Sequence, residues 1–164
     1  MMNLTNNMRA QFAEELRVKM QTNRKIFLLT ADLGYAMFDK IKEEFPEQFL
    51  NTGAAEQTML DIAVGMAYSG MTPFCYSITP FLLYRGFETI RTYICHEQLN
   101  VKLIGGGRND DYKHDGFSHD ATDDLKIMMN LRLNIRKPES IEEMKYDLDE
   151  LISIKEPYYI NLTR

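Results

Sequence analysis

The sequence contains few of the residues that cross-link small proteins or bind metals. Its 164 residues include two cysteines and three histidines. Cys75 and Cys95 form no C-x-x-C pair, which favours reduced thiols in the cytoplasm over a disulfide framework or a zinc site. No two histidines have the spacing of metal ligands on a helix, so we predict no metal site built by this chain alone.

The chain also lacks an excess of basic residues and a long apolar run. Its net charge is −5 at pH 7, whereas a nucleic-acid-binding domain usually presents a basic face. No apolar run approaches the roughly 18 residues that cross a bilayer, and residues 1–20 contain no apolar signal-peptide core. These absences predict a cytoplasmic protein that binds neither nucleic acid nor membrane.

What the chain does contain is a regular alternation of helix-like and strand-like segments. Gly70 is a predicted helix C-cap, and Ser140 with Glu143 has a capping-box pattern. The spacing of apolar residues predicts helices over 8–20, 35–46, 54–70, 81–98, 124–131 and from residue 140. Short apolar runs predict strands over 25–34, 72–79, 101–107, 133–138 and 157–164.

Strands separated by helices predict an α/β fold, a three-layer, doubly wound and mostly parallel sheet with helices on both faces. We expect one domain over residues 1–164 that is complete at its C-terminus. In such sheets, ligands bind beyond the carboxyl ends of the strands. The loops predicted to carry a site are those around Asp32, 53–56, 79–81 and 105–119.

Glu56 is the first residue in these loops that could carry chemistry. It falls in the first turn of its predicted helix, where the helix dipole favours an anion. One interpretation is a carboxylate that helps to cap the helix. The other is a carboxylate held in a pocket, where it shares a proton with a ligand.

Other candidates are also ambiguous on local sequence. His119, in "DGFSHDATDD", is either a solvated loop histidine or a polar group that reaches a ligand from a flexible loop. Phe81 and Tyr84 belong to an aromatic stripe that is typical of a core but could stack on a flat heterocycle. The run "IGGGRND" lacks the G-x-G-x-x-G spacing of a nucleotide site.

Taken together and in order, these segments resemble the pyrimidine-binding domain of the transketolase family of thiamine-diphosphate enzymes, which includes deoxyxylulose-phosphate synthase. The resemblance covers essentially the whole chain. The segments that carry it are "LLTADLG", "FPEQFLNTGAAEQTMLDIAVGMAYSGMTPF", "FLLYRGFETIR", "LNVKLIGGG", "DGFSHDATDD", "RKPES" and "YYINLTR".

The resemblance implies roles for individual residues. Glu56 matches the glutamate that bonds a ring nitrogen of the aminopyrimidine and favours the tautomer that accepts the thiazolium proton. Phe81 matches the ring that stacks on the pyrimidine, with Tyr84 as a second candidate, and Asp32 lies on the cofactor side. The residues implied to act at the substrate are His119, near the reacting centre, Asp115 at a sugar hydroxyl, and Arg9 and Lys137 at a phosphate.

The chain departs from the family pattern at the substrate end. Lys137 replaces an arginine, Asp120 replaces a glutamine, and Arg108 stands where a histidine is expected. Lysine holds a phosphate as a point charge and not as a bidentate fork. These changes bear on the sugar-phosphate site more than on the cofactor site.

The resemblance also implies a partner, because the chain has no "GDG…N" motif for the cofactor's diphosphate. We expect a separately encoded, diphosphate-binding subunit of the transketolase N-terminal type to hold Mg²⁺ and complete the site. The chain would be a transferase subunit that moves a two-carbon ketol unit between sugars or sugar phosphates. It would be inactive alone and paired with its own copy inside a hetero-oligomer.

Two other functions stay open on the sequence. A non-catalytic assembly or regulatory module could have kept the fold, since the phosphate-site residues are altered. The domain could also serve another thiamine-diphosphate enzyme, such as a 2-oxoacid dehydrogenase or a decarboxylase.

Overall fold

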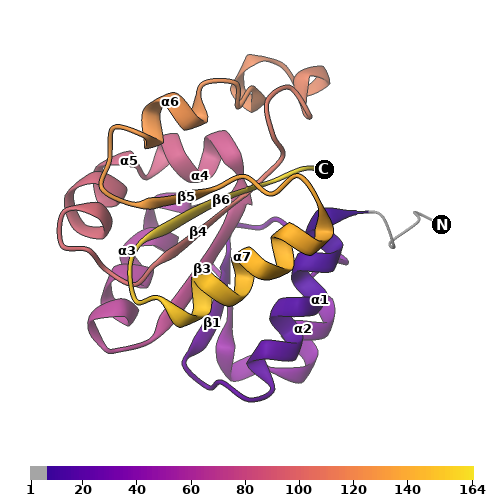
Figure 1. Ribbon diagram of the computed structural model, residues 1–164, viewed down its shortest axis with the longest axis vertical. Coiled ribbons are helices and arrows are strands. Elements are labelled where there is room, and N and C mark those ends of the chain that lie inside the picture. Colours follow the sequence, from indigo (N-terminus) through magenta and orange to yellow (C-terminus); the bar gives the residue numbers. More distant parts are fainter. Residues whose placement is uncertain (1–6) are drawn as a thin grey trace.

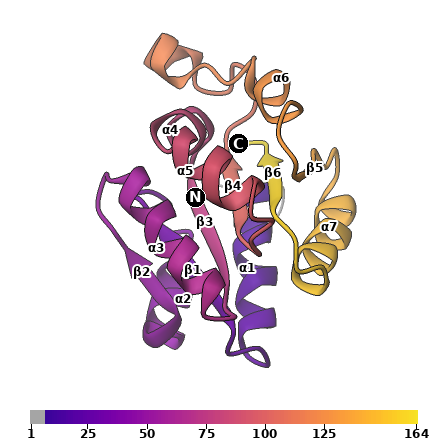
Figure 2. The same cartoon turned by 90° about the vertical axis from the view of Figure 1, so that its left-hand side faces the viewer.

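Six parallel strands form the sheet at the centre of the molecule, in the order β2-β1-β3-β4-β6-β5 (Figures 1 and 2). The computed structural model describes residues 7–164, so the part of the signal-peptide argument that concerns residues 1–6 lies outside the described residues. All neighbouring strands run parallel. The strands are β1 (Ile26–Thr30), β2 (Phe49–Asn51), β3 (Thr72–Ile78), β4 (Lys102–Gly106), β5 (Asn134–Arg136) and β6 (Tyr158–Leu162).

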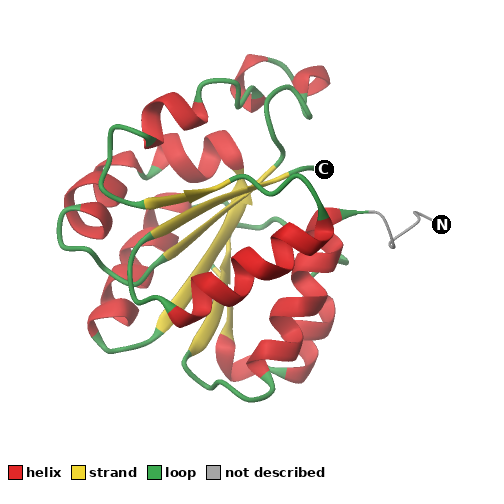
Figure 3. Ribbon diagram, viewed as in Figure 1, coloured by secondary structure: helices red, strands yellow, loops and turns green. Residues whose placement is uncertain are grey.

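Helices cover both faces of this sheet, as the alternation of segments predicts (Figures 2 and 3). One face is covered by α1 (Met8–Met20), α2 (Asp39–Glu44) and α7 (Ile141–Ser153). The other is covered by α3 (Glu56–Tyr68), α4 (Thr79–Arg85), α5 (Phe87–Thr89), the π-helix η3 (Ile90–Cys95) and α6 (Asp124–Met128). The predicted three-layer α/β architecture is therefore confirmed.

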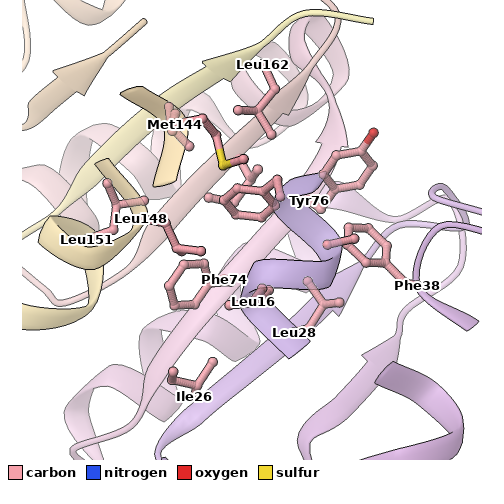
Figure 4. Packing of buried hydrophobic residues seen from close by; sticks show 14 of the residues in the cluster. Leu16, Ile26, Leu28, Phe38, Phe74, Tyr76, Met144, Leu148, Leu151 and Leu162 are labelled. Atoms are coloured by element: carbon pink, nitrogen blue, oxygen red, sulfur yellow. The ribbon is translucent and has the colours of Figure 1, made fainter. Parts of the chain in front are cut away.

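The two faces of β3 pack against different helices. Successive strand residues point to opposite faces. Phe74 and Tyr76 pack with Leu16 of α1 and Leu148 of α7 (Figure 4). Ser77, one residue further along, is fully buried and turns toward α3.

Helix α3 has the end that its sequence predicts. Gly70 follows the helix at a φ of 81°. Its N–H donates to Ala67 O at 3.0 Å, and the N–H of Met71 donates to Met66 O at 3.0 Å. This pair of bonds is a Schellman motif, which requires a residue that tolerates positive φ.

One prediction about elements was wrong, and one strand was not predicted. The continuous helix expected over 81–98 is divided at Gly86 into α4 and α5 and continues as the π-helix η3. Strand β2 (Phe49–Asn51) has only three residues, too few to show an alternating pattern in the sequence, and its Leu50 is exposed. Pairing with β1 holds it in the sheet. Within residues 7–164 no helix is long and apolar enough to cross a membrane.

Candidate active site

Glu56 is a buried carboxylate at the start of α3, with 1% of its surface exposed. Ser77 Oγ donates to Glu56 Oε1 at 2.9 Å, and Arg85 Nη1 donates to Glu56 Oε2 at 2.8 Å. The N-cap position of α3 is Ala55, and no side chain caps the helix there. The carboxylate therefore faces β3 and α4, where it is held by a strand hydroxyl and a helix cation.

Phe81 and Arg85 lie one turn apart on α4 and stack on each other. The Arg85 Cζ atom is 3.8 Å from the centre of the Phe81 ring. His119 meets the same ring edge-on, with 4.8 Å between ring centres. Residues spaced by four share one helix face, so α4 presents a ring and a cation together to the Glu56 carboxylate.

Tyr84 has a different neighbour. Its hydroxyl donates to an Asp123 carboxylate oxygen in the segment before α6. Partial burial and the Asp123 carboxylate raise the pKa of the Tyr84 hydroxyl. Of the two aromatic candidates on α4, only Phe81 contacts both Arg85 and His119 among the described residues.

Tyr112 links His119 to the N-terminus of α1. Its ring centre lies 6.4 Å from that of His119, and its hydroxyl accepts a hydrogen bond from Arg9. A pocket of about 490 Å³ opens beside it, lined by Arg9, Leu33, Tyr35, Met37 and Tyr76 among other residues. Arg9 Nε is buried there and has no hydrogen-bond partner in the described part of the chain.

Asp32, Asp115 and Lys137 lie at the same edge of the sheet but contact other groups. Asp32 is exposed, and its backbone N–H donates to Asn51 Oδ1 at 2.9 Å. Asp115 pairs with His114 at 3.3 Å, and Lys137 lies 3.9 Å from a Glu139 oxygen. In residues 7–164, no hydrogen bond or ion pair joins any of the three to Glu56, Phe81 or His119.

Arg108 is held by groups within the chain. It is 5% exposed, and its Nη2 donates to Pro138 O at 2.8 Å and to Asn161 O at 2.6 Å. Its Nε donates to Asn161 Oδ1 at 2.9 Å. Its Nη1 lies 3.2 Å from Glu139 Oε1, so the guanidinium connects the ends of β4 and β6 to the segment before α7.

Comparison with known proteins identifies the family of the chain. The family model "Transketolase, pyrimidine binding domain" matches residues 5–164. The chain belongs to the transketolase pyrimidine-binding family. It is 32% identical over 162 residues, 96% of its length, to a putative transketolase C-terminal section of Methanocaldococcus jannaschii, and covers 50% of that protein. It is 31% identical over 121 residues, 73% of its length, to one subunit of an apulose-4-phosphate transketolase of Actinobacillus succinogenes, and covers 39% of that subunit.

Solved structures of transketolases have the same fold. A split-gene transketolase, in the form of an inactive beta4 tetramer, superposes with a TM-score of 0.86 at 31% identity, over 97% of this chain and 52% of that one. A Campylobacter jejuni transketolase has a TM-score of 0.86 at 18% identity, over 96% of this chain and 26% of that one. The chain thus spans about half the length, or less, of these relatives.

For this member of the pyrimidine-binding family, sequence reasoning missed two residues that contact the buried carboxylate. Ser77 lies on the face of β3 that α3 covers, and strand alternation from Cys75, which is on the same face, could have identified it. Arg85 follows Phe81 by four residues in a predicted helix, a spacing that places both on one face. Glu56, Phe81 and His119 were expected near one another, and the structure brings them together through Arg85.

Proposed function

We propose that this chain is the pyrimidine-binding subunit of a split, thiamine-diphosphate-dependent transketolase-like enzyme. It would transfer a two-carbon ketol unit between sugars or sugar phosphates. The observation that carries this proposal is Glu56, a carboxylate that is 1% exposed and that shares its Arg85 partner with the face of the Phe81 ring. Burying a carboxylate is costly, so a site that keeps one next to a ring platform fits a heterocycle with ring nitrogens.

The residues present fit the cofactor's aminopyrimidine. Glu56 would hold a ring nitrogen and share a proton with it, because it lies in a water-poor site against Ser77. Phe81 would stack on the face of the aminopyrimidine. His119, which contacts the Phe81 ring, would form the side of the site away from Glu56. When bound, thiamine diphosphate supplies the carbanion-stabilising centre, while these side chains supply position and proton transfer.

The substrate end is proposed around Arg9 and His119. Arg9 lines the 490 Å³ pocket and Tyr112 connects it to His119. Arg9 would bind an anionic group of the substrate. Asp115 and Lys137 are exposed to 43% and 38% of their side-chain surfaces, so they would contribute only if the loops that carry them move against a partner chain.

A second polypeptide is part of the proposal. The relatives include a protein described as a transketolase subunit and a split-gene transketolase. We propose that this chain likewise needs a diphosphate-binding subunit, which would hold Mg²⁺ with the diphosphate, and that its own copies pair inside the complex. The chain alone would then be inactive.

The test is reconstitution with the product of the adjacent gene, if that product carries a "GDG" motif and a downstream asparagine. The two chains, thiamine diphosphate and Mg²⁺ should transfer a ketol unit from a ketose phosphate to an aldose phosphate, and each chain alone should not. Glu56→Gln should lower kcat by about 10²–10⁴-fold, the usual contribution of acid–base catalysis.

Thr58→Ala is the matched control, because Thr58 is an exposed residue two positions further along α3. Its activity should equal that of the unsubstituted complex. Full activity of Glu56→Gln would refute the role of Glu56. Turnover of pyruvate in place of a ketose phosphate would assign the chain to another thiamine-diphosphate enzyme. Calorimetry that finds no cofactor binding by the complex would support a non-catalytic module.

A further inference from the structure

Arg85 lies between the two groups that the proposed function assigns to the aminopyrimidine. Its Nη1 is 2.8 Å from Glu56 Oε2, and its Cζ is 3.8 Å above the Phe81 ring centre. One guanidinium thus makes both contacts, the in-plane hydrogen bond to the carboxylate and the face contact with the ring.

The chemistry of a guanidinium is close to that of an aminopyrimidine. Both are flat, both have N–H donors in the plane, and both stack on an aromatic face. Arginine therefore satisfies the same two neighbours that a bound heterocycle would satisfy. It also neutralises Glu56, whose charge would otherwise be buried without a cation.

The Arg85 side chain lies partly in solvent and can turn away from Glu56 and Phe81. It is 46% exposed, whereas the Glu56 side chain is 1% exposed. Arg85 is the last residue of α4, directly before Gly86. The guanidinium can exchange its own contact for water, but the buried Glu56 carboxylate would then lack a cation. Arg85 therefore rotates outward, without a change in the helix, when another donor takes its place at Glu56.

We propose that Arg85 is a specificity-determining residue that occupies the aminopyrimidine's place in the free chain and moves out when the ring binds. This inference rests on the proposed function. Glu56 then always has a partner, Arg85 before binding and the ring after it. A ligand enters only if it replaces both the hydrogen bond to Glu56 and the stacking on Phe81, which selects a flat heterocycle with an in-plane donor or a protonated ring nitrogen.

The first test uses the chain alone and needs no ligand. In ¹⁵N NMR spectra the Nη–H signal of Arg85, assigned by its loss in Arg85→Lys, should be protected from exchange with water, because Nη1 donates to Glu56. Glu56→Gln should remove this protection, because Gln offers a neutral and weaker acceptor. An Arg85 signal that exchanges as fast as that of Arg91, an exposed arginine with no ion pair among the described residues, would overturn the proposal.

The second test measures binding of the pyrimidine half of the cofactor, 4-amino-5-hydroxymethyl-2-methylpyrimidine, to the chain by calorimetry. If Arg85 fills the site in about nine molecules of ten, Arg85→Ala should bind the probe about tenfold more tightly, because apparent affinity scales with the open fraction. Arg91→Ala removes the same charge outside the site and should bind as the unsubstituted chain does. Arg85→Lys keeps the charge but cannot cover the ring, and should show an intermediate gain.

The outcomes separate this inference from the proposed function. Unchanged or weaker binding in Arg85→Ala, with clear binding to the unsubstituted chain, would overturn the occupancy of the site by Arg85 and leave the function standing. If no variant binds the probe, and the complex with a partner chain binds no thiamine diphosphate, both are overturned. Probe binding that displaces the Arg85 signal and disappears in Glu56→Gln supports both.

Discussion

At the scale of single residues, the glycines of the "GGG" run have a packing role that the sequence did not reveal. A Cβ atom on Gly105 would lie 2.6 Å from Thr79 Oγ1 and 3.0 Å from Tyr159 Cε2. Thr79 is buried, and its hydroxyl donates to Gly107 O at 2.7 Å. The run therefore lets β4 approach the start of α4 closely, which places Phe81 and Arg85 at the site.

Gly105→Ala is expected to destabilise the protein by about 1–3 kcal/mol, the usual cost of overpacking a buried position. The extra methyl group would push Thr79 away from its bond to Gly107. Urea denaturation followed by circular dichroism measures the free energy of unfolding.

Gly65→Ala is the control for that substitution. Gly65 is exposed in α3, its φ is not positive, and a Cβ atom there meets nothing within 4 Å. Alanine is the better helix former, so the variant should gain about 0.5–1 kcal/mol. Equal stability of the Gly105 and Gly65 variants would refute the packing argument.

The candidate site shows what residue types and spacing reveal on their own. Glu56 and His119 could be selected because the segments that carry them, "GAAEQ" and "DGFSH", resemble the family pattern. Their contacts could not be foreseen, since the partner of Glu56 depends on the rotamer of Arg85 and on which face of β3 carries Ser77. The hydrogen bonds of Arg108 could not be foreseen for the same reason, because their acceptors on Pro138 and Asn161 lie far away in the sequence.

At the scale of elements, the start of helix α7 is the boundary that local sequence predicts most clearly. Ser140 is the N-cap, and its Oγ accepts the N–H of Glu143 at 3.1 Å. The Glu143 carboxylate reaches back to the N–H of Glu139 at 2.7 Å, one residue earlier than in a standard capping box. Long helices with caps were predictable, whereas β2 and the π-helix depend on tertiary contacts.

Ser140→Ala should therefore lower the free energy of unfolding by about 1 kcal/mol, through the loss of the cap. Ser153→Ala, at the last residue of the same helix, is the control. The Ser153 hydroxyl only donates back to Glu150 O at 3.1 Å, and alanine has the higher helix propensity. If the two variants unfold at the same urea concentration, the cap contributes nothing.

At the scale of the whole molecule, Lys102 joins the centre of the sheet to the chain that follows α7. It is fully buried in β4, and its Nζ donates to Ile154 O at 2.8 Å and Glu156 O at 2.6 Å. The ring centre of Tyr158 lies 4.7 Å from the same nitrogen. Burial lowers the pKa of Lys102 from 10.5 to about 7, while the charge of Glu156 opposes that shift.

This shift predicts a stability that rises with pH. Between pH 7 and about 10 the unfolded chain holds the Lys102 proton and the folded chain releases it, so the free energy of unfolding increases with pH by up to about 1.4 kcal/mol per unit. Below pH 7 both states are protonated and the dependence on this residue ends. The folded-state pKa of Cys95 is raised to about 11 by burial, which opposes the rise above about pH 9.

Urea denaturation at about pH 6.5, 7.5 and 8.5 isolates the effect, because the cysteine thiols are protonated over most of that range. The unsubstituted chain should gain about 1–2 kcal/mol from the lowest to the highest pH, and Lys102→Met should lose that gain. If the free energy of unfolding changes with pH equally in the unsubstituted chain and in Lys102→Met, the two carbonyl oxygens and the Tyr158 ring keep the Lys102 ammonium charged. The cation would then be a permanent part of the link between the sheet and α7.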